Sequence, residues 1–263
     1  MKHDAAAPPP WRRALAPVLA VLVFLAAWEG GVRAFHVPPY LLPAPSLIAA
    51  TLADNFGSLM ASWWFTVRIT FAALALAIAG GVAIAAVFAL SRTAERALAP
   101  FAVVLQVTPI VAIAPLIMIV TDSPLATVLV CAWIVAFFPI LANTLTGLRS
   151  ADERLRDFLR LHRATRWQTL RHLLVPAALP SFMTGLRIAG GLALIGEVVA
   201  EFVAGVAGRD TGLASRILEA DFRTEIPKMF AALSLVALTG VAIYLLTAAL
   251  SRALLGRWHE SER

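Results

Sequence analysis

The stretch SADERLRDFLRLHRATRWQTLRHLLVPAALP, residues 150–180, decides the fold, because it is basic and helical in pattern while the segments around it are almost wholly apolar. Residues 150–153 and 165–168 have the capping-box pattern, in which two side chains take up free backbone N–H groups at a helix start. Pro176 disfavours helical geometry at Val175, so the second helix should end there. The stretch therefore predicts a short helix–turn–helix between membrane spans.

Both expected helices are apolar on one side and cationic on the other, which is typical of a helix that packs through one face. The apolar faces consist of Leu155, Phe158 and Leu159 in the first helix and of Trp167, Leu170, Leu173 and Leu174 in the second. Two interpretations fit this pattern: a loop that lies on lipid headgroups, or a docking element for a cytoplasmic partner.

The composition is that of a membrane protein, since 60% of the 263 residues are apolar and 14% are charged. Uncharged apolar runs of roughly 20 residues recur, and that length crosses a bilayer as a helix. We therefore expect an all-α integral membrane protein with six transmembrane helices and a cytoplasmic two-helix loop at residues 150–180. The expected spans are 14–35, 58–90, 98–120, 125–148, 181–203 and 227–255, with short connector helices at 46–54 and 213–222 and terminal tails at 1–13 and 256–263.

The distribution of basic residues orients these spans. Most of the 22 Lys and Arg residues lie in the termini and in the loops at 91–96 and 150–180, which share one side of the membrane. The connectors on the other side contain only Arg33, Arg209, Arg216, Arg223 and Lys228. The positive-inside rule therefore places both termini in the cytoplasm. The net charge of +6 follows from this topology and does not indicate nucleic-acid binding.

The sequence contains no recognisable arrangement of catalytic or metal-binding residues. It has no G-x-x-x-x-G-K-[ST] motif for ATP phosphates, and its five histidines lack the spacing of metal ligands. The single cysteine, Cys131, lies in an apolar run and excludes an intrachain disulfide. An enzyme is therefore disfavoured, and transport is the remaining broad class.

Five residues within the expected spans are candidates for lining a transport path: Gln106, Pro109, Asn143, Glu197 and Glu201. Glu197 and Glu201 share one helix face, and ionisable groups at membrane depth usually face a bundle interior or water. Alternatively, the glutamates lie near the outer mouth, and the amides hydrogen-bond between helices. Pro109, Pro115 and Pro139 either break helices around a cavity or only kink them.

Two pairs of glycines lie in the expected spans, Gly80 with Gly81 and Gly190 with Gly191. Glycine lets helices approach each other closely in lipid. Since one bundle of six helices is also small for a gated path, we expect a homodimer with the path near its two-fold axis.

Residues 157–176 resemble the coupling loop of permease subunits of bacterial ATP-binding-cassette (ABC) importers. The family pattern is Glu-Ala-Ala, three residues, Gly, nine residues and Ile-x-Leu-Pro, and it aligns with Asp157, Phe158, Leu159, Arg163, Leu173, Val175 and Pro176. Further stretches resemble the nitrate/sulfonate/taurine-type branch: LLPAPSL at 41–47, TPIVAIAPL at 108–116, FFPILANTLTGLRSAD at 137–152, RWQTLRHLLVPAALP at 166–180 and GEVVAEF at 196–202. The resemblance covers nearly the whole chain.

This resemblance implies a type I importer permease in the bacterial inner membrane. Such a permease would form a homodimer, bind two cytoplasmic ATPase subunits and receive its solute from a periplasmic or extracellular binding protein. ATP and Mg²⁺ would be used by the ATPase, and we expect no cofactor on this chain. The residues assigned to ATPase coupling are Asp157, Phe158, Leu159, Arg160, Arg163, Ala164, Thr165, Trp167, Leu173 and Pro176.

The alternative is a self-sufficient channel, or a secondary transporter that is coupled to an ion through Glu197 or Glu201. Inverted repeats in the sequence would favour this alternative, and none is visible.

Two features modify what the resemblance implies. Arg163 stands where the family has glycine, and arginine tolerates a positive φ poorly, so either the turn is built differently or the partner's groove is more acidic. Residues 216–232 resemble permeases for pyrimidine thiamine precursors or riboflavin more than those for sulfonates. The expected substrate is a small polar organic solute or anion: a sulfonate, taurine or nitrate-like solute, a pyrimidine thiamine precursor, or riboflavin.

Overall fold

A computed structural model of the chain describes residues 10–204 and 211–256. The described residues form helices joined by short connectors and contain no β-strand. In chain order the elements are α1 (Pro10–Ala34), α2 (Pro45–Asp54), α3 (Phe56–Leu90), α4 (Arg92–Val107), α5 (Ile110–Thr121), α6 (Pro124–Arg149), α7 (Glu153–Leu161), α8 (Arg166–Thr169), the π-helical turn η1 (Leu170–Leu174), α9 (Val175–Ala204), α10 (Leu213–Phe222) and α11 (Ile226–Leu255). The all-α fold that the sequence predicts is confirmed.

Four of the described helices are long and apolar enough to cross a membrane: α1, α3, α6 and α11. The consecutive helices α4 and α5 form a fifth candidate span, which is bent by 105°. α9 is not among these candidates, but it covers the remaining expected span, 181–203. Its 30 residues give a helix length of about 45 Å, which exceeds the thickness of about 30 Å of the hydrocarbon core of a bilayer. The short helices α2 and α10 lie in the connectors, where the sequence predicts them.

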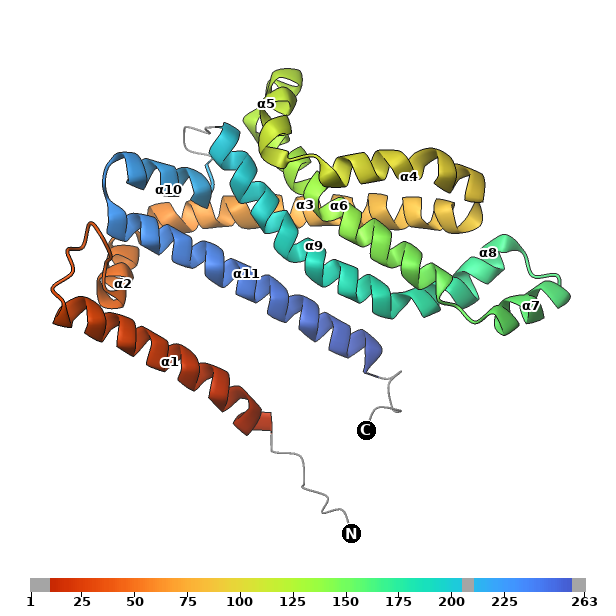
Figure 1. Cartoon of the computed structure of the whole chain (residues 1–263), viewed down its shortest axis with the longest axis horizontal. Coiled ribbons are helices and arrows are strands. Elements are labelled where there is room, and N and C mark those ends of the chain that lie inside the picture. The colour runs from red at the N-terminus through yellow and green to blue at the C-terminus, as the bar shows by residue number, and fades with distance from the viewer. Residues whose placement is uncertain (1–9, 205–210, 257–263) are drawn as a thin grey trace, which may run out of the picture.

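α6 lies at the centre of the bundle and packs along both α9 and α3 (Figure 1). Small residues bring the helix backbones close together. A β-carbon at Gly147 would lie 2.8 Å from the backbone of Ala178, and one at Gly185 would lie 2.8 Å from the carbonyl oxygen of Pro139. The largest apolar cluster fills the remaining space between these helices. Close backbone approach therefore builds the core, as is usual for helices in lipid.

The two glycine pairs that the sequence singles out lie in helices of this core. A β-carbon at Gly81 would lie 2.8 Å from Ile140 of α6, and one at Gly190 would lie 2.7 Å from Ile243 of α11, whereas Gly191 faces open space. Gly81 and Gly190 therefore account for contacts within one chain, and a homodimer needs other support.

The three prolines that could break helices behave differently. Pro109 is the N-cap residue of α5, and the bend between α4 and α5 lies there. Pro115 and Pro139 lie inside α5 and α6, which continue through them. Pro109 suits the break because it has no backbone N–H to leave unpaired at a helix start.

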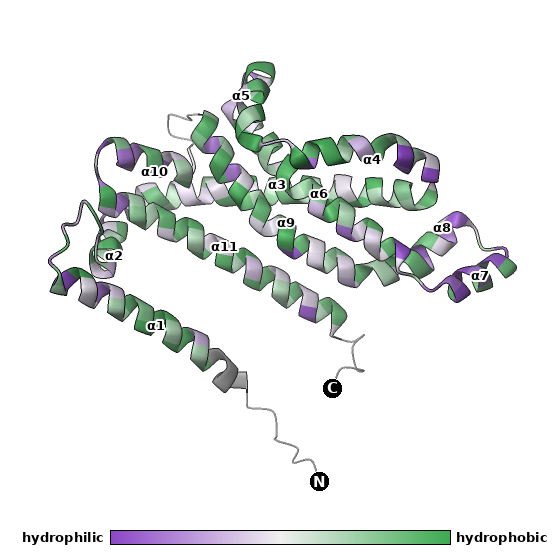
Figure 2. Cartoon of the chain, in the orientation of Figure 1, coloured by the Kyte–Doolittle hydropathy of each residue, from purple (hydrophilic) through white to green (hydrophobic). Residues whose placement is uncertain are grey.

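α1 lies apart from the bundle and exposes its apolar side chains, as a helix in contact with lipid does (Figure 1, Figure 2). It is attached near its C-terminal end, where the ring of Trp28 lies 6.2 Å from that of Phe230 in α11. The carboxylate of Glu29 accepts hydrogen bonds from the amide and hydroxyl groups of Ser46, at 2.9 and 2.7 Å. These contacts hold α1 against α2 and α11 at one end only.

The two ends of the bundle carry different elements. α2 and α10 lie at one end, and α7 and α8 project from the other (Figure 1). α11 runs from the end with α10 toward the end with α7, and α1 runs in the opposite direction. Hydrophilic residues concentrate on α7, α8, α10 and the start of α4, while the long helices are mainly apolar (Figure 2).

Candidate functional site

The candidate site is the projecting two-helix unit, which comprises α7, α8 and η1. Its first helix begins at Asp152, whose carboxylate accepts a hydrogen bond of 2.8 Å from the N–H of Arg154. The capping box expected at residues 150–153 is wrong. The hydroxyl of Ser150 instead donates to the carbonyl oxygen of Gly147, at 2.9 Å, and Ser150 closes α6. Asp152, which is charged and directly precedes α7, caps this helix instead of Ser150.

The turn after α7 has the geometry that suits glycine, although an arginine occupies it. Arg163 has a φ of 53°, in the left-handed region. The N–H of Ala164 donates to the carbonyl oxygen of Leu159, and that of Arg163 donates to the carbonyl oxygen of Arg160, both at 2.9 Å. This hydrogen-bond pair is a Schellman motif, which ends a helix with a left-handed residue. The backbone of the turn therefore has the left-handed geometry of a Schellman motif. An arginine in this conformation lowers the stability of the fold by about 1–2 kcal/mol relative to a glycine.

The second helix starts with the capping box that the sequence predicts. The N–H of Gln168 donates to the hydroxyl oxygen of Thr165 at 3.2 Å, and the N–H of Thr165 donates to the side-chain oxygen of Gln168 at 2.8 Å. Together with the Schellman motif, this box fixes both sides of the four-residue turn at 162–165.

The prediction that the second helix ends before Pro176 is wrong. Val175 is helical, with φ −64° and ψ −48°, and the chain continues without a break into α9. The N–H of Val175 donates to the carbonyl oxygen of Leu170, five residues back, so the extra residue of the π turn η1 absorbs the strain at the proline. As a result, the second half of the unit is joined to a long helix of the core by unbroken helical backbone.

The apolar residues of the unit separate into a buried and an exposed set. Leu170 and Leu174 are buried against the ends of the long helices, and Leu173 is half-buried beside them. The exposed set, here called the apolar tip, consists of Leu155, Phe158, Leu161 and Trp167. Leu161 is 82% exposed and Trp167 is 67% exposed. Large exposed apolar side chains on the two helices of one projecting unit indicate an interaction surface.

Sequence reasoning missed Leu161 and grouped Leu159 with Leu155 and Phe158 on one apolar face. Leu161 follows Phe158 by three residues and so lies on the same side of α7. Leu159 is half-buried, as is Ala164, with which it shares the hydrogen bond of the turn. Arg163 and Thr165 are exposed on the projecting turn, as expected.

The exposed ion pair of α7 contributes little to the stability of the unit. Asp157 and Arg160 form an ion pair of 3.2 Å with side chains 66% and 79% exposed. Such an exposed pair contributes about 0–1 kcal/mol. Arg156 instead anchors α7, because it donates to the carbonyl oxygen of Leu148 at the end of α6, at 2.8 Å.

The residues proposed to line a path are not gathered in one place. Gln106 lines a cavity of about 310 Å³ at the bend between α4 and α5, together with Thr108 and Pro139, and Pro109 is exposed at the same bend. Asn143 donates a hydrogen bond of 2.9 Å to the carbonyl oxygen of Pro139, one turn back in its own helix.

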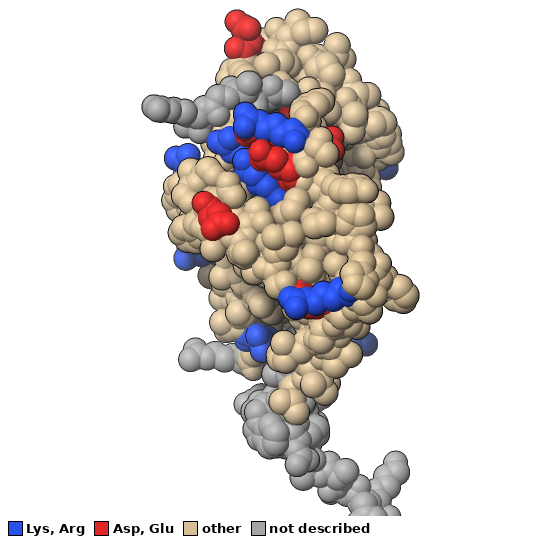
Figure 3. Space-filling model, turned by 90° about the vertical axis from the view of Figure 1, so that its left-hand side faces the viewer, with Lys and Arg blue, Asp and Glu red and all other residues tan. Residues whose placement is uncertain are grey.

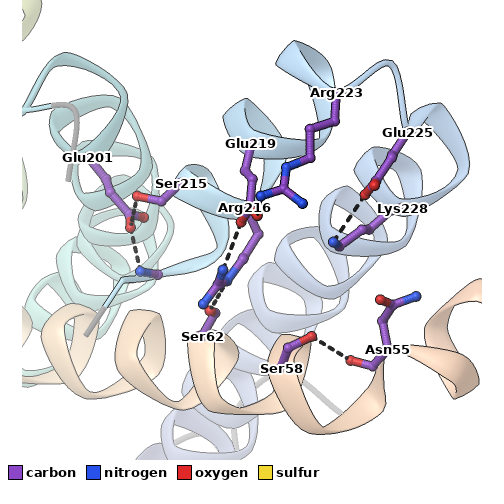
Figure 4. A network of polar contacts seen from close by, with 11 residues as sticks. Asn55, Ser58, Ser62, Glu201, Ser215, Arg216, Glu219, Arg223, Glu225 and Lys228 are labelled. Atoms are coloured by element: carbon purple, nitrogen blue, oxygen red, sulfur yellow. Dashed lines mark hydrogen bonds and ion pairs between the residues drawn. The ribbon is translucent and has the colours of Figure 1, made fainter. Parts of the chain in front are cut away.

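Glu201 fastens the connector helix α10 to α9. It is fully buried and accepts hydrogen bonds from the N–H of Gly212, from the N–H of Ala214 at 3.1 Å and from the hydroxyl of Ser215 at 2.6 Å (Figure 4). It thereby supplies acceptors for free N–H groups at the N-terminus of α10, which stabilises the start of that helix. Glu197 is also fully buried, one turn earlier in α9. In this geometry neither carboxylate is open to solvent.

A polar network continues from this cap across the same end of the bundle (Figure 3, Figure 4). Arg216 donates to Ser62 of α3 at 2.9 Å and to Glu219 at 2.8 Å, and Arg223 pairs with Glu219 at 3.0 Å. The hydrogen bond from Arg216 is the main cause that lowers the pKa of Glu219 below its usual value. Residues 211–225 are therefore a folded part of this surface, held to α3 and α9 by polar contacts.

Residues 77–256 match the family described as "Binding-protein-dependent transport system inner membrane component". This range includes the candidate site and most of the bundle. The chain belongs to this family. The type I ABC importer permease suggested by the sequence motifs is thereby confirmed, and the protein is the transmembrane permease subunit of an ABC importer for small solutes. Family membership decides against the self-sufficient channel.

Curated relatives of the permease cover nearly its whole length. It is 35% identical to the riboflavin transport system permease protein RibX of Chloroflexus aurantiacus, over 94% of this chain and 91% of the relative. It is 33% identical to the formylaminopyrimidine transport permease protein ThiX of Halalkalibacterium halodurans, over 87% and 90%. It is 28% identical to the putative aliphatic sulfonates transport permease protein SsuC of Bacillus subtilis, over 95% and 89%.

A solved structure supports the fold. One chain of an amino acid ABC transporter aligns with a TM-score of 0.62 at 15% identity, covering 79% of this permease and 97% of that chain. At this identity the likeness concerns the fold alone.

Proposed function

We propose that the permease couples ATP hydrolysis by a separate cytoplasmic ATPase to solute movement, and that the two-helix unit is the ATPase docking element. The observation that carries this proposal is the apolar tip, Leu155, Phe158, Leu161 and Trp167, which is exposed on a unit projecting from the bundle. The unbroken helical backbone through η1 into α9 supplies the mechanical link, since a movement of the unit is transmitted to a core helix. ATP and Mg²⁺ belong to the ATPase in this arrangement.

The complete importer would contain two permease copies, two ATPase subunits and a substrate-binding protein in the bacterial inner membrane. The opposite courses of α1 and α11 support two cytoplasmic termini on the side of the unit (Figure 1). The end with α2 and α10 would then face the binding protein. The second permease copy is supported by the resemblance to type I importer permeases, and the exposed apolar surface of α5 is a candidate for the contact between the copies.

For the substrate, we propose a flat heteroaromatic solute of the riboflavin or formylaminopyrimidine kind. Support comes from the relatives named for these solutes, which are 35% and 33% identical, whereas the sulfonate relative is 28% identical. The likeness of residues 216–232 to such permeases points the same way.

Vesicle uptake tests both parts of this proposal. The permease is reconstituted with its ATPase and binding protein, and uptake of labelled riboflavin, formylaminopyrimidine and taurine is measured with and without ATP. We expect ATP-dependent uptake of one of the first two solutes. Uptake without the ATPase would refute the coupling, and uptake of taurine alone would refute the substrate class.

A further inference from the structure

A second feature lies beside the two-helix unit, where the ends of α3, α4 and α6 meet α7. An open cavity of about 670 Å³ is found there. Its lining consists of Phe88, Ala89, Arg92, Glu95, Arg96, Ala99, Leu148, Arg149, Arg156 and Leu174. Four arginines and one glutamate give this cavity a formal charge of +3, and the other lining residues are apolar.

Most of this positive charge is not neutralised within the described part of the chain. Glu95 forms an ion pair with Arg149. In residues 10–204 and 211–256, no carboxylate lies within 4.0 Å of the guanidinium groups of Arg92, Arg96 or Arg156. The buried Nε of Arg156 also has no hydrogen-bond partner among the described residues. A buried donor without a partner is costly, and this one belongs to an arginine that lines the cavity.

The cavity continues beneath the two-helix unit. A neighbouring cavity of about 450 Å³ shares Ala89, Arg156 and Leu174 with it and is also lined by Arg160 and Arg166. Arginines therefore line two adjoining cavities, here together called the groove, between the ends of the long helices and α8.

We propose that this groove binds the phosphate-bearing headgroup of an anionic phospholipid from the adjacent membrane leaflet. The guanidinium groups supply the charge and the paired donors that a phosphate requires. Phe88, Leu148 and Leu174 are buried beneath the cavity, and Ala89 and Ala99 are half-buried, so the arginines make up most of its accessible lining. Basic pockets between transmembrane helices at the cytoplasmic interface suit such headgroups. Because the cavity lies at the ends of membrane helices, its position favours a lipid headgroup over a free anion.

The test measures lipid binding to the purified full chain by native mass spectrometry, in detergent containing phosphatidylglycerol or phosphatidylcholine. The wild type should retain phosphatidylglycerol in preference to phosphatidylcholine. Arg92→Gln with Arg96→Gln should weaken that binding about 30-fold, because each arginine near an anionic lipid contributes about a factor of five. The control, Arg154→Gln with Arg171→Gln, removes the same charge from exposed positions outside both cavities and should bind like the wild type.

Three outcomes would overturn the proposal. Equal weakening in the control would show that total charge, and not the cavity, attracts the lipid. Displacement of the lipid by excess inorganic phosphate would assign the groove to a free anion. Unchanged lipid binding together with loss of ATPase co-purification in the cavity variant would assign the arginines to acidic residues of the ATPase. If the double variant does not fold, Arg96→Gln alone serves, with an expected weakening of about fivefold.

Discussion

Replacing Trp167 by alanine should release the ATPase. This tryptophan is 67% exposed on the apolar tip. Its full surface is about 250 Å², so a groove on the ATPase could cover about 170 Å² of it. At about 25 cal/mol per Å² of apolar surface, this corresponds to at most about 4 kcal/mol. An interface residue of this kind typically contributes 2–4 kcal/mol, so Trp167→Ala should weaken ATPase binding by about 30-fold to 1000-fold.

The assay is ATPase co-purification from membranes, followed by titration of the purified ATPase onto the permease in nanodiscs. The matched control is Phe222→Ala, which removes an aromatic side chain that is 84% exposed at the opposite end of the bundle. Arg160→Ala provides a second comparison and should weaken binding by less than about 1 kcal/mol, because its ion pair is exposed. If Trp167→Ala binds the ATPase like the control, the unit is a surface loop on lipid and the docking interpretation is refuted.

Four further outcomes follow from particular contacts. Arg163→Gly should raise the melting temperature of the permease, because glycine adopts the left-handed turn without strain and removes about 1 kcal/mol of cost; an unchanged or lower value would contradict this. Gly185→Val should lower expression of folded protein, measured by gel filtration, since its β-carbon would overlap the backbone of α6, and a normal yield would refute that packing. Glu201→Ala should expose the connector around α10 to limited proteolysis, whereas Glu201→Gln, which keeps an acceptor, should do so less; equal cleavage in both would argue against capping. The stabilising effect of Glu219 relative to Glu219→Gln should persist above pH 4.5 and disappear as the pH falls through its lowered pKa, and melting curves that show the effect growing toward acid would contradict the Arg216 pair.

Much of the fold can be predicted from the sequence because the bilayer imposes a simple rule on length and composition. The predicted spans at 58–90, 125–148 and 227–255 differ by only one or two residues from the ends of α3, α6 and α11. The capping box at Thr165 is also predictable, since it depends on two side chains three residues apart.

What could not be predicted depends on contacts between distant segments. The local sequence at Pro176 predicts a helix end, but a π turn accommodates the proline. The helix continues because Leu170 and Leu174 pack into the core. Ser150 has a valid capping pattern, yet Asp152 competes for the same role from a closer position.

The glutamates of α9 illustrate the same difficulty. The spacing of Glu197 and Glu201 shows that they share a helix face, but not which segment covers that face. In the fold the N-terminus of α10 returns to Glu201, 11 residues later in the chain, and pairs with it. A role in the path is still a prediction for both residues, whereas the capping contact of Glu201 is observed.

The docking claim is tested most directly by photocross-linking from the apolar tip. Leu161, the most exposed residue of this tip, is replaced by cysteine in a Cys131→Ser background and labelled with a benzophenone maleimide. Phe222→Cys, labelled in the same way, reports on the opposite end of the bundle. In the assembled importer, irradiation should join the Leu161 position to the ATPase and should not join the Phe222 position to it. An ATPase cross-link from Phe222, or lipid adducts alone from Leu161, would contradict the account.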